Sequence, residues 1–281
     1  MHHKRNRKGK AKTTLISKTA LITGASSGIG VEYAKVLASK SYNLVIVSNE
    51  EAIHDVANSI IHEYKVDVKS LLIDLATDEA PYELFNYCKE QNIQIDVLVN
   101  NAGILVFNEI DHIPDKKVEA IIKLHVQTPT LLCKLFGTEM KKRKEGHILL
   151  MSSLAAWIRY PGILLYSATK RYLKDFGKAF HYEMKDYNVG VTTICPGAIN
   201  TNMYTLSNKY RKIALFSGIM MNPDKLAKKA IRKMFKNRTT YIPGFLTKIS
   251  IAVIKITPMS FVQFIRHKTG ILEKRKNAEV K

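Results

Sequence analysis

The sequence predicts an α/β fold: a doubly wound parallel sheet with helices on both faces, in a single domain. Short apolar runs alternate with longer stretches of helical periodicity. Strands that are apolar throughout are typical of parallel sheets covered on both faces. In addition, 46% of the 281 residues are hydrophobic, which is enough for one large core.

The expected elements alternate from the first strand onward. Strands are expected at residues 18–24, 43–48 and 69–75, within 95–103, at 146–153 and 190–197, and at the shorter 239–244. Helices are expected at 28–39, up to about 64, at 115–142 and at 165–186. Because ligands of such sheets bind beyond the carboxyl ends of the strands, the segments that follow each strand are the candidate binding loops.

The net charge of +20 is concentrated at the two ends of the chain. Residues 1–18 carry seven Lys and Arg and no acid, whereas residues 19–202 carry 19 basic and 21 acidic residues. Residues 203–281 carry 18 basic and three acidic residues. Basic ends attract anionic lipid, nucleic acid or an acidic substrate, although a lysine-rich solubilising surface explains them equally well.

Cysteine usage and hydropathy limit the class of protein. Cys88, Cys133 and Cys195 are widely spaced, and the sequence contains no CxxC pair. This pattern indicates neither a disulfide framework nor a metal site, so we expect no metal and a reducing, cytoplasmic compartment. We also expect neither a secretory signal nor a membrane span, because no uncharged apolar run is long enough.

The motif TGASSGIG follows the first expected strand and opens the first helix. Gly24, Gly28 and Gly30 let the chain turn sharply and approach a ligand closely. The helix start offers unpaired N–H groups to a pyrophosphate, and Ser26 and Ser27 add hydroxyl donors. A glycine-rich turn without a ligand is the structural alternative.

Two further strand ends carry candidate cofactor contacts. Asp74 ends the third strand, where its carboxylate can accept a hydrogen bond from an adenine amino group. The motif NNAG follows the fourth strand, and Ala102 and Gly103 would let an adenosine ribose lie close to the backbone. A capping Asp and an ordinary turn are the structural alternatives.

The motif YSATK is the most specific signal in the sequence. Tyr166 and Lys170 are four residues apart in an expected helix, so they share one face. An ammonium beside a phenol lowers its pKa and makes it a better acid–base catalyst. Ser153 lies thirteen residues earlier, at the carboxyl end of the fifth strand, where its hydroxyl can hold a substrate oxygen. A surface Tyr/Lys pair is the structural alternative.

The motifs TGASSGIG, NNAG, YSATK and PGAINT, with Asp74 and Ser153, occur in this order over about residues 18–202. As a set they resemble the short-chain dehydrogenase/reductase family. The resemblance implies a Rossmann-type fold and hydride transfer between nicotinamide and a carbonyl carbon, with Tyr166 as general acid/base. It also implies that Lys170 lowers the pKa of Tyr166 and binds the nicotinamide ribose, while Ser153 orients the substrate oxygen.

The chain is accordingly divided into a basic tail at 1–17, a dinucleotide-binding catalytic domain at 18–245 and a basic, apolar extension at 246–281. The resemblance implies a dimer or tetramer through the helices at 115–142 and 165–186. The expected cofactor-binding residues, from the motifs and the resemblance together, are Gly24, Ser26, Ser27, Gly28, Ile29, Gly30, Ser48, Asn49, Asp74, Asn101, Ala102, Gly103, Tyr166, Lys170, Pro196, Gly197, Ile199 and Thr201.

One departure from the family pattern concerns the long helix before the fifth strand. The family usually places an Asn there, which organises a water-linked proton relay to the Lys. In this sequence His125 stands at that position. We expect His125 to be a fourth catalytic residue, because an imidazole can bind water or move a proton; a packed helix residue is the structural alternative.

A second departure concerns the choice of cofactor. Ser48 stands where an acidic residue usually accepts the ribose hydroxyls of NAD, and Asn49 stands where an Arg commonly binds the 2′-phosphate of NADP. Glu50 and Glu51 follow and are expected to point outward. Because the missing acid is the stronger discriminator, we expect NADP(H) in preference to NAD(H).

The segments after residue 201 are where substrate choice is expected. Residues 202–221 mix apolar side chains with Lys and Arg, typical of a lid over an apolar substrate or of a helix packed on the body. Residues 241–268 are aliphatic and basic and contain no acid. They suit an anionic membrane interface, an oligomer contact or a final packed helix.

We therefore expect an oxidoreductase that interconverts an apolar ketone or aldehyde and its alcohol. A 3-oxoacyl reductase of lipid metabolism and a dinucleotide-binding regulatory protein with little turnover are the alternatives. The expected partners are the small-molecule substrate, further copies of the chain, and an anionic membrane surface to which the cytoplasmic protein attaches peripherally. Nucleic acid is not expected, because no nucleic-acid motif is present.

Overall fold

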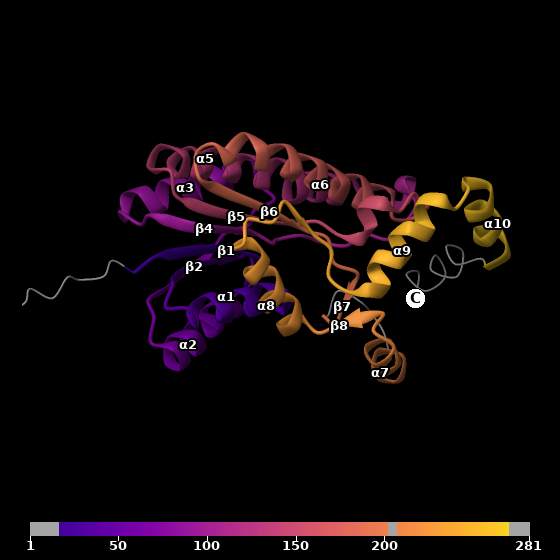
Figure 1. Ribbon diagram of the computed structural model, residues 1–281, viewed down its shortest axis with the longest axis horizontal. Helices are drawn as coiled ribbons and strands as arrows, with labels where there is room; N and C mark the ends of the chain where they lie inside the picture. Colours follow the sequence, from indigo (N-terminus) through magenta and orange to yellow (C-terminus); the bar gives the residue numbers. More distant parts are fainter. Residues whose placement is uncertain (1–16, 202–206, 270–281) are drawn as a thin grey trace, which may run out of the picture.

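A seven-stranded parallel sheet forms the centre of the protein (Figure 1). The computed structural model describes residues 17–201 and 207–269. The strands, in sheet order, are β3 (Val68–Leu72), β2 (Asn43–Ser48), β1 (Thr19–Thr23), β4 (Ile95–Asn100), β5 (Gly146–Met151), β6 (Val189–Ile194) and β9 (Thr240–Tyr241). Every neighbouring pair is parallel. Because the strand order reverses between β1 and β4, a ligand crevice is expected at their carboxyl ends.

Helices cover both faces of the sheet (Figure 1). One face carries α1 (Gly28–Ala38), α2 (Ala52–Tyr64) and α8 (Pro223–Met234), and the other carries α3 (Ala80–Glu90), α5 (Thr128–Arg143) and α6 (Leu164–Lys185). Successive residues of β1 alternate between the two cores, with Ala20 and Ile22 in one and Leu21 in the other. The fold class predicted from the sequence is therefore confirmed, since fully apolar strands face a core on each side.

The remaining elements lie beyond the carboxyl ends of the strands or extend the chain. They are η1 (Ile110–His112), α4 (Asp115–Ile122), the π-helix η2 (Lys123–Gln127), η3 (Leu154–Trp157), the strand pair β7 (Ala198–Ile199) and β8 (Met220–Met221), α7 (Asn208–Phe216), α9 (Phe245–Ile256) and α10 (Met259–Thr269). No helix within the described residues is long and apolar enough to cross a membrane.

Several boundaries differ from the expected ones. The third strand ends at Leu72 and not at residue 75; it lies at the sheet edge, and none of its residues is fully buried. The expected helix at 115–142 is interrupted by the π-helix at Lys123–Gln127. Helices α3 and α8 were not expected, because their apolar positions are interspersed with polar and charged ones. Part of the expected lid (202–206) and most of the basic tail (1–16) lie outside the described residues.

The central strands carry the fold's hydrophobic stabilisation, so we expect Leu98→Ala to lower the free energy of unfolding by about 2–5 kcal/mol. Leu98 on β4 is 0% exposed, and the substitution leaves a cavity. The matched variant Leu72→Ala removes the same atoms from the sheet edge, where the side chain is 45% exposed, and should cost less than about 1 kcal/mol. Urea denaturation measures both, and equal losses would contradict the assignment of the core.

Candidate active site

A cavity of about 660 Å³ lies beyond the carboxyl ends of the strands. Its wall contains all of the predicted catalytic and cofactor-binding residues except Gly30. Gly30 instead lies behind the wall, where a Cβ would overlap the carbonyl oxygen of Gly24. The volume lies within the range typical of small-molecule and cofactor sites.

The floor of the cavity is made by two loops that follow β1 and β4. Gly24 has a φ of +65°, and a Cβ at this position would lie 2.8 Å from Ala102 Cα. The side chain of Asn101 donates to the carbonyl oxygens of Thr23 and Gly24, at 3.0 Å each. The backbone N–H groups of Asn101 and Ala102 donate to Thr23 Oγ1, at 2.9 and 3.0 Å. The two loops are therefore joined without any ligand.

Thr23 is a site residue that the sequence reasoning missed. Its side chain is buried, and its hydroxyl donates to the carbonyl oxygen of Val99 at 3.3 Å while it accepts from the loop after β4. The available signal was a hydroxyl residue at the last position of an otherwise apolar strand.

The end of β2 places a carboxylate beside the glycine loop. Ser26 donates to Glu50 Oε2 at 2.6 Å, and Ser48 donates to Ser26 Oγ at 2.9 Å. The backbone N–H of Glu50 donates to Ser48 Oγ at 3.2 Å, and Glu50 lines the cavity with Asn49. The expectation that Glu50 points outward is therefore wrong, because the turn after β2 brings its side chain back onto the loop after β1.

Asp74 lies two residues beyond the end of β3 and is exposed. Its Oδ1 accepts the N–H of Ala76 at 3.0 Å, so it caps the turn after the strand. It also lines the cavity. Asp74 therefore caps a turn, as the structural alternative expected, and also lines the cavity.

The residues Tyr166, Lys170 and Ser153 all line the cavity. Lys170 is 5% exposed, and its Nζ lies 5.6 Å from the centroid of the Tyr166 ring and donates to the Met151 carbonyl oxygen at 2.9 Å. Ser153 caps η3, where its Oγ accepts the N–H of Ala155 at 3.1 Å. Burial lowers the pKa of Lys170 from its ordinary 10.5 to about 8.

Ser152 is a second residue that the sequence analysis did not identify. Its hydroxyl donates to the backbone carbonyl oxygen of Lys170 at 2.6 Å and is buried. This bond ties α6 to the end of β5. Both serines of the sequence "MSS" line the cavity, whereas only Ser153 was expected to do so.

His125 is 0% exposed on the π-helix, and both of its ring nitrogens have partners. Nε2 accepts the N–H of Ile104 at 3.1 Å, so the proton of the neutral ring is on Nδ1. Nδ1 then donates to Thr169 Oγ1 at 2.9 Å, and Thr169 donates to the Tyr166 carbonyl oxygen at 3.0 Å. Burial, followed by the charge of Lys170, holds the pKa of His125 well below its usual range.

The position of His125 also explains a glycine in the NNAG motif. A Cβ at Gly103 would lie 2.5 Å from His125 Nε2 and 3.4 Å from Lys170 Nζ. The loop after β4, the π-helix and α6 therefore meet at a point that leaves no room for a side chain at position 103.

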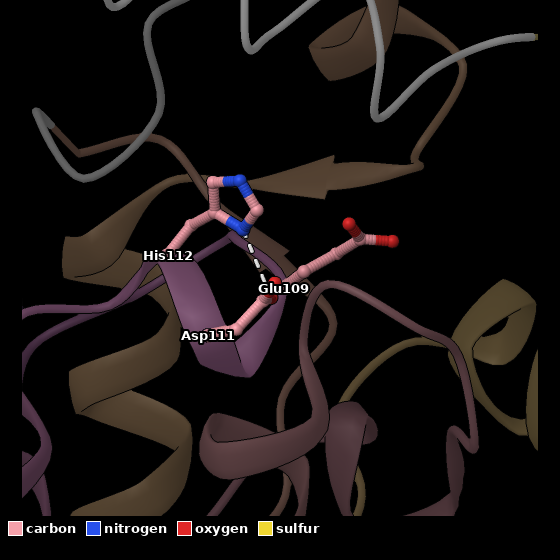
Figure 2. A group of neighbouring side chains, drawn as sticks. All are labelled: Glu109, Asp111 and His112. Carbon is pink, nitrogen blue, oxygen red and sulfur yellow. Dashed lines mark hydrogen bonds and ion pairs between the residues drawn. The ribbon is translucent and has the colours of Figure 1, made fainter.

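A separate group of polar side chains lies on η1 and does not line the cavity. Ligand atoms of Glu109, Asp111 and His112 lie within 4.8 Å of one another. Figure 2 shows Asp111 joined to His112 Nδ1, at 2.9 Å, with Glu109 extending beside them. Asp111 and His112 are exposed, and the geometry between them is that of a surface ion pair.

The fold and this site define an NAD(P)-dependent oxidoreductase of the Rossmann type. The chain belongs to the short-chain dehydrogenase family, since the family model described as short chain dehydrogenase matches residues 18–212. The match runs along the chain from β1 to the start of α7.

The relatives include 3-oxoacyl reductases and a protein named as inactive. A 3-oxoacyl-[acyl-carrier-protein] reductase of Chlamydia trachomatis is 30% identical over 82% of this chain and 94% of its own. The very-long-chain 3-oxoacyl-CoA reductase of Anas platyrhynchos is 31% identical over 67% of this chain, and this chain spans 62% of its length. An inactive hydroxysteroid dehydrogenase-like protein of Homo sapiens is 30% identical over 67% of this chain and 58% of its own.

A solved structure shows the same fold. A short-chain dehydrogenase from Sphingobium yanoikuyae in complex with NADPH superposes with a TM-score of 0.73, covering 91% of this chain and 95% of that one. The two sequences are 22% identical.

The buried Lys170 should destabilise the fold, so we expect Lys170→Met to raise the free energy of unfolding at about pH 7 by up to about 3 kcal/mol. The folded-state pKa is lowered, so the unfolded chain binds more protons between about pH 8 and 10.5. The penalty is therefore complete below about pH 8 and fades towards pH 10.5. Urea denaturation at about pH 7 and pH 10 measures it. Lys178→Met, exposed on the same helix, is the matched control, and equal gains for both variants would contradict the prediction.

Proposed function

We propose that the protein reduces an apolar ketone or aldehyde, or oxidises the matching alcohol, with Tyr166 as general acid/base. The observation that carries the proposal is that Tyr166, the buried Lys170 and Ser153 all line the cavity, with Lys170 Nζ 5.6 Å from the centroid of the Tyr166 ring. The glycine loop fits a dinucleotide, because Gly24 and Gly28 leave the start of α1 open to a phosphate. When bound, NAD(P)(H) supplies or accepts the hydride.

The side chains of this chain supply orientation and the proton. Ser153 Oγ already accepts the N–H of Ala155, so its own hydrogen can be donated to a substrate oxygen. The Tyr166 hydroxyl donates a proton to that oxygen in reduction and accepts one in oxidation. The Lys170 ammonium favours the phenolate that remains when Tyr166 gives up its proton.

We propose that His125 is a positioning residue. Both of its ring nitrogens are engaged, and its neutral ring links the loop after β4 to Thr169 on α6. Burial beside Lys170 opposes protonation, so a proton relay through the ring would require two hydrogen bonds to break. Its packing fixes the backbone of Tyr166 through Thr169.

A 3-oxoacyl thioester is the second candidate substrate. Several relatives carry names with this activity, and the one from Chlamydia trachomatis aligns over 82% of this chain and 94% of its own. Comparison of acyl-thioester substrates with free ketones separates the two candidates. The inactive human relative is consistent with the other alternative, a dinucleotide-binding regulatory protein with little turnover. Binding of the dinucleotide without turnover would favour that alternative.

The choice between the two dinucleotides depends on the end of β2. Ser48 carries no charge, and this supports the proposed preference for NADP(H) over NAD(H). Glu50 acts in the opposite direction, because its carboxylate lies on the glycine loop, where it would repel a 2′-phosphate. The cations on the described cavity wall are Lys117 and Lys170, which belong to α4 and α6. Because the uncharged Ser48 favours NADP(H) and the carboxylate of Glu50 opposes it, we propose that the preference for NADP(H) is small.

We expect Glu50→Gln to strengthen NADPH binding about tenfold relative to NADH, because it removes the repulsion and keeps the hydrogen bond from Ser26. Fluorescence titration of the two reduced cofactors measures the dissociation constants without any substrate. Glu51→Gln, exposed one residue further on, is the matched control. If the ratio of the two constants is unchanged by Glu50→Gln, the carboxylate has no part in cofactor selection.

We expect Tyr166→Phe to lower kcat at least about a hundredfold and to leave the dissociation constant of NADPH nearly unchanged, since only the proton donor is lost. The decrease of nicotinamide absorbance with a panel of ketones, aldehydes and 3-oxoacyl thioesters measures turnover. Tyr172→Phe, on the same helix, is the control. A parent protein that binds neither cofactor would refute the proposed function.

We also propose that the protein forms a homo-oligomer and attaches to an anionic membrane surface in the cytoplasm. The resemblance of α5 and α6 to the family's assembly helices supports the first part. The basic charge of residues 203–281 supports the second.

A further inference from the structure

The C-terminal end of the molecule presents large apolar side chains to solvent. Phe216 at the end of α7 is 97% exposed, and Phe245 and Ile256 at the two ends of α9 are 78% and 80% exposed. Phe261 and Phe264 on α10 are 53% and 60% exposed. Contiguous apolar surface on a soluble protein marks a site of interaction. These five side chains, with Ile219, are here named the C-terminal apolar face.

The three helices that carry this face lie at one end of the molecule. Figure 1 shows α7, α9 and α10 at the same end of the molecule. A Cβ at Gly218, just after α7, would lie 3.7 Å from Leu246 Cδ1 on α9. The turn after α7 therefore approaches α9.

The charge around the face has one sign. The described parts of α7, α9 and α10 contain no Asp or Glu, and residues 225–268 contain none at all. Exposed lysines flank the apolar side chains; they are Lys209, Lys212, Lys248, Lys255 and Lys268. Apolar side chains bordered by lysines match the interface of an anionic bilayer. A second copy of the same face would bring like charges together.

The face begins at the edge of the cavity. α9 packs against η3, which follows Ser153. Gly197 lines the cavity, and a Cβ there would lie 2.8 Å from Thr247 Oγ1 on α9. A surface that docks on α9 would therefore lie next to the cavity wall.

We propose that the C-terminal apolar face is the surface by which the protein docks on an anionic lipid bilayer, with the cavity beside the membrane. This rests on the proposed peripheral attachment and deepens it by naming the helices and the orientation. Phe216, Phe245 and Ile256 enter the interfacial region, and the flanking lysines bind lipid phosphates. An apolar carbonyl substrate dissolved in the bilayer would then lie close to the cavity.

Co-sedimentation of the full chain with vesicles tests the proposal. We expect binding to vesicles that contain phosphatidylglycerol, little binding to phosphatidylcholine alone, and release at high salt. The double variant Phe216→Ser/Phe261→Ser should weaken binding at least about tenfold, and so should Lys248→Glu/Lys255→Glu.

Matched controls come from the amino-terminal end of the strands, where α1, α5 and α6 end. Tyr182→Ser replaces a 58% exposed aromatic side chain near the end of α6. Lys40→Glu/Lys144→Glu reverses two exposed charges that follow α1 and α5. Both controls should bind vesicles as the parent does. Tyr166→Phe should also bind normally, so a failure of catalysis is distinguishable from a failure of docking.

Two results would overturn the proposal. One is equal binding to both kinds of vesicle, or to neither. The other is a change in oligomeric mass, measured by light scattering, on Phe216→Ser/Phe261→Ser without a change in vesicle binding, which would assign the face to contact between copies of the chain.

Discussion

The site depends on the approach of two backbones that leaves no room for a side chain between them. The loops after β1 and β4 meet because these strands are neighbours and parallel, and Gly24 lies against Ala102. Thr23 and Asn101 then join the loops by hydrogen bonds in both directions. The cavity floor is thus set by sheet topology and by the absence of one Cβ, before any ligand binds.

In contrast to the hydrogen-bonded floor, the part of the cavity that contains Lys170 is electrostatically unfavourable. Lys170 is held in a nearly dry environment by the Met151 carbonyl oxygen, where an ammonium is less stable than in water. The neighbouring His125 responds to the same environment by staying neutral. One buried charge is kept beside Tyr166 and a second is excluded, so the proposed general acid/base has a cation next to it at a cost in stability.

The sequence was sufficient for the sheet and for the loops, because apolar strands and the carboxyl-end rule are local signals. Contacts between distant segments were not accessible in this way. The direction of Glu50 depends on the turn after β2, and the partners of His125 are contributed by a loop and by α6. Helix α8 was not expected for a different reason. Its buried residues have helical spacing, but lysines separate them in the sequence; they are Leu226, Ala227, Ala230 and Ile231.

The topology of the chain brings the basic C-terminal segments to the carboxyl ends of the strands. After β6 the chain forms β7, α7 and β8 at the carboxyl edge of the sheet, and after β9 it returns there as α9. Charge and apolar surface that seem diffuse along the sequence are thereby gathered beside the cavity. The body is near neutral, with 19 basic and 21 acidic residues over 19–202, so the field that attracts anions is concentrated at the ends of the chain.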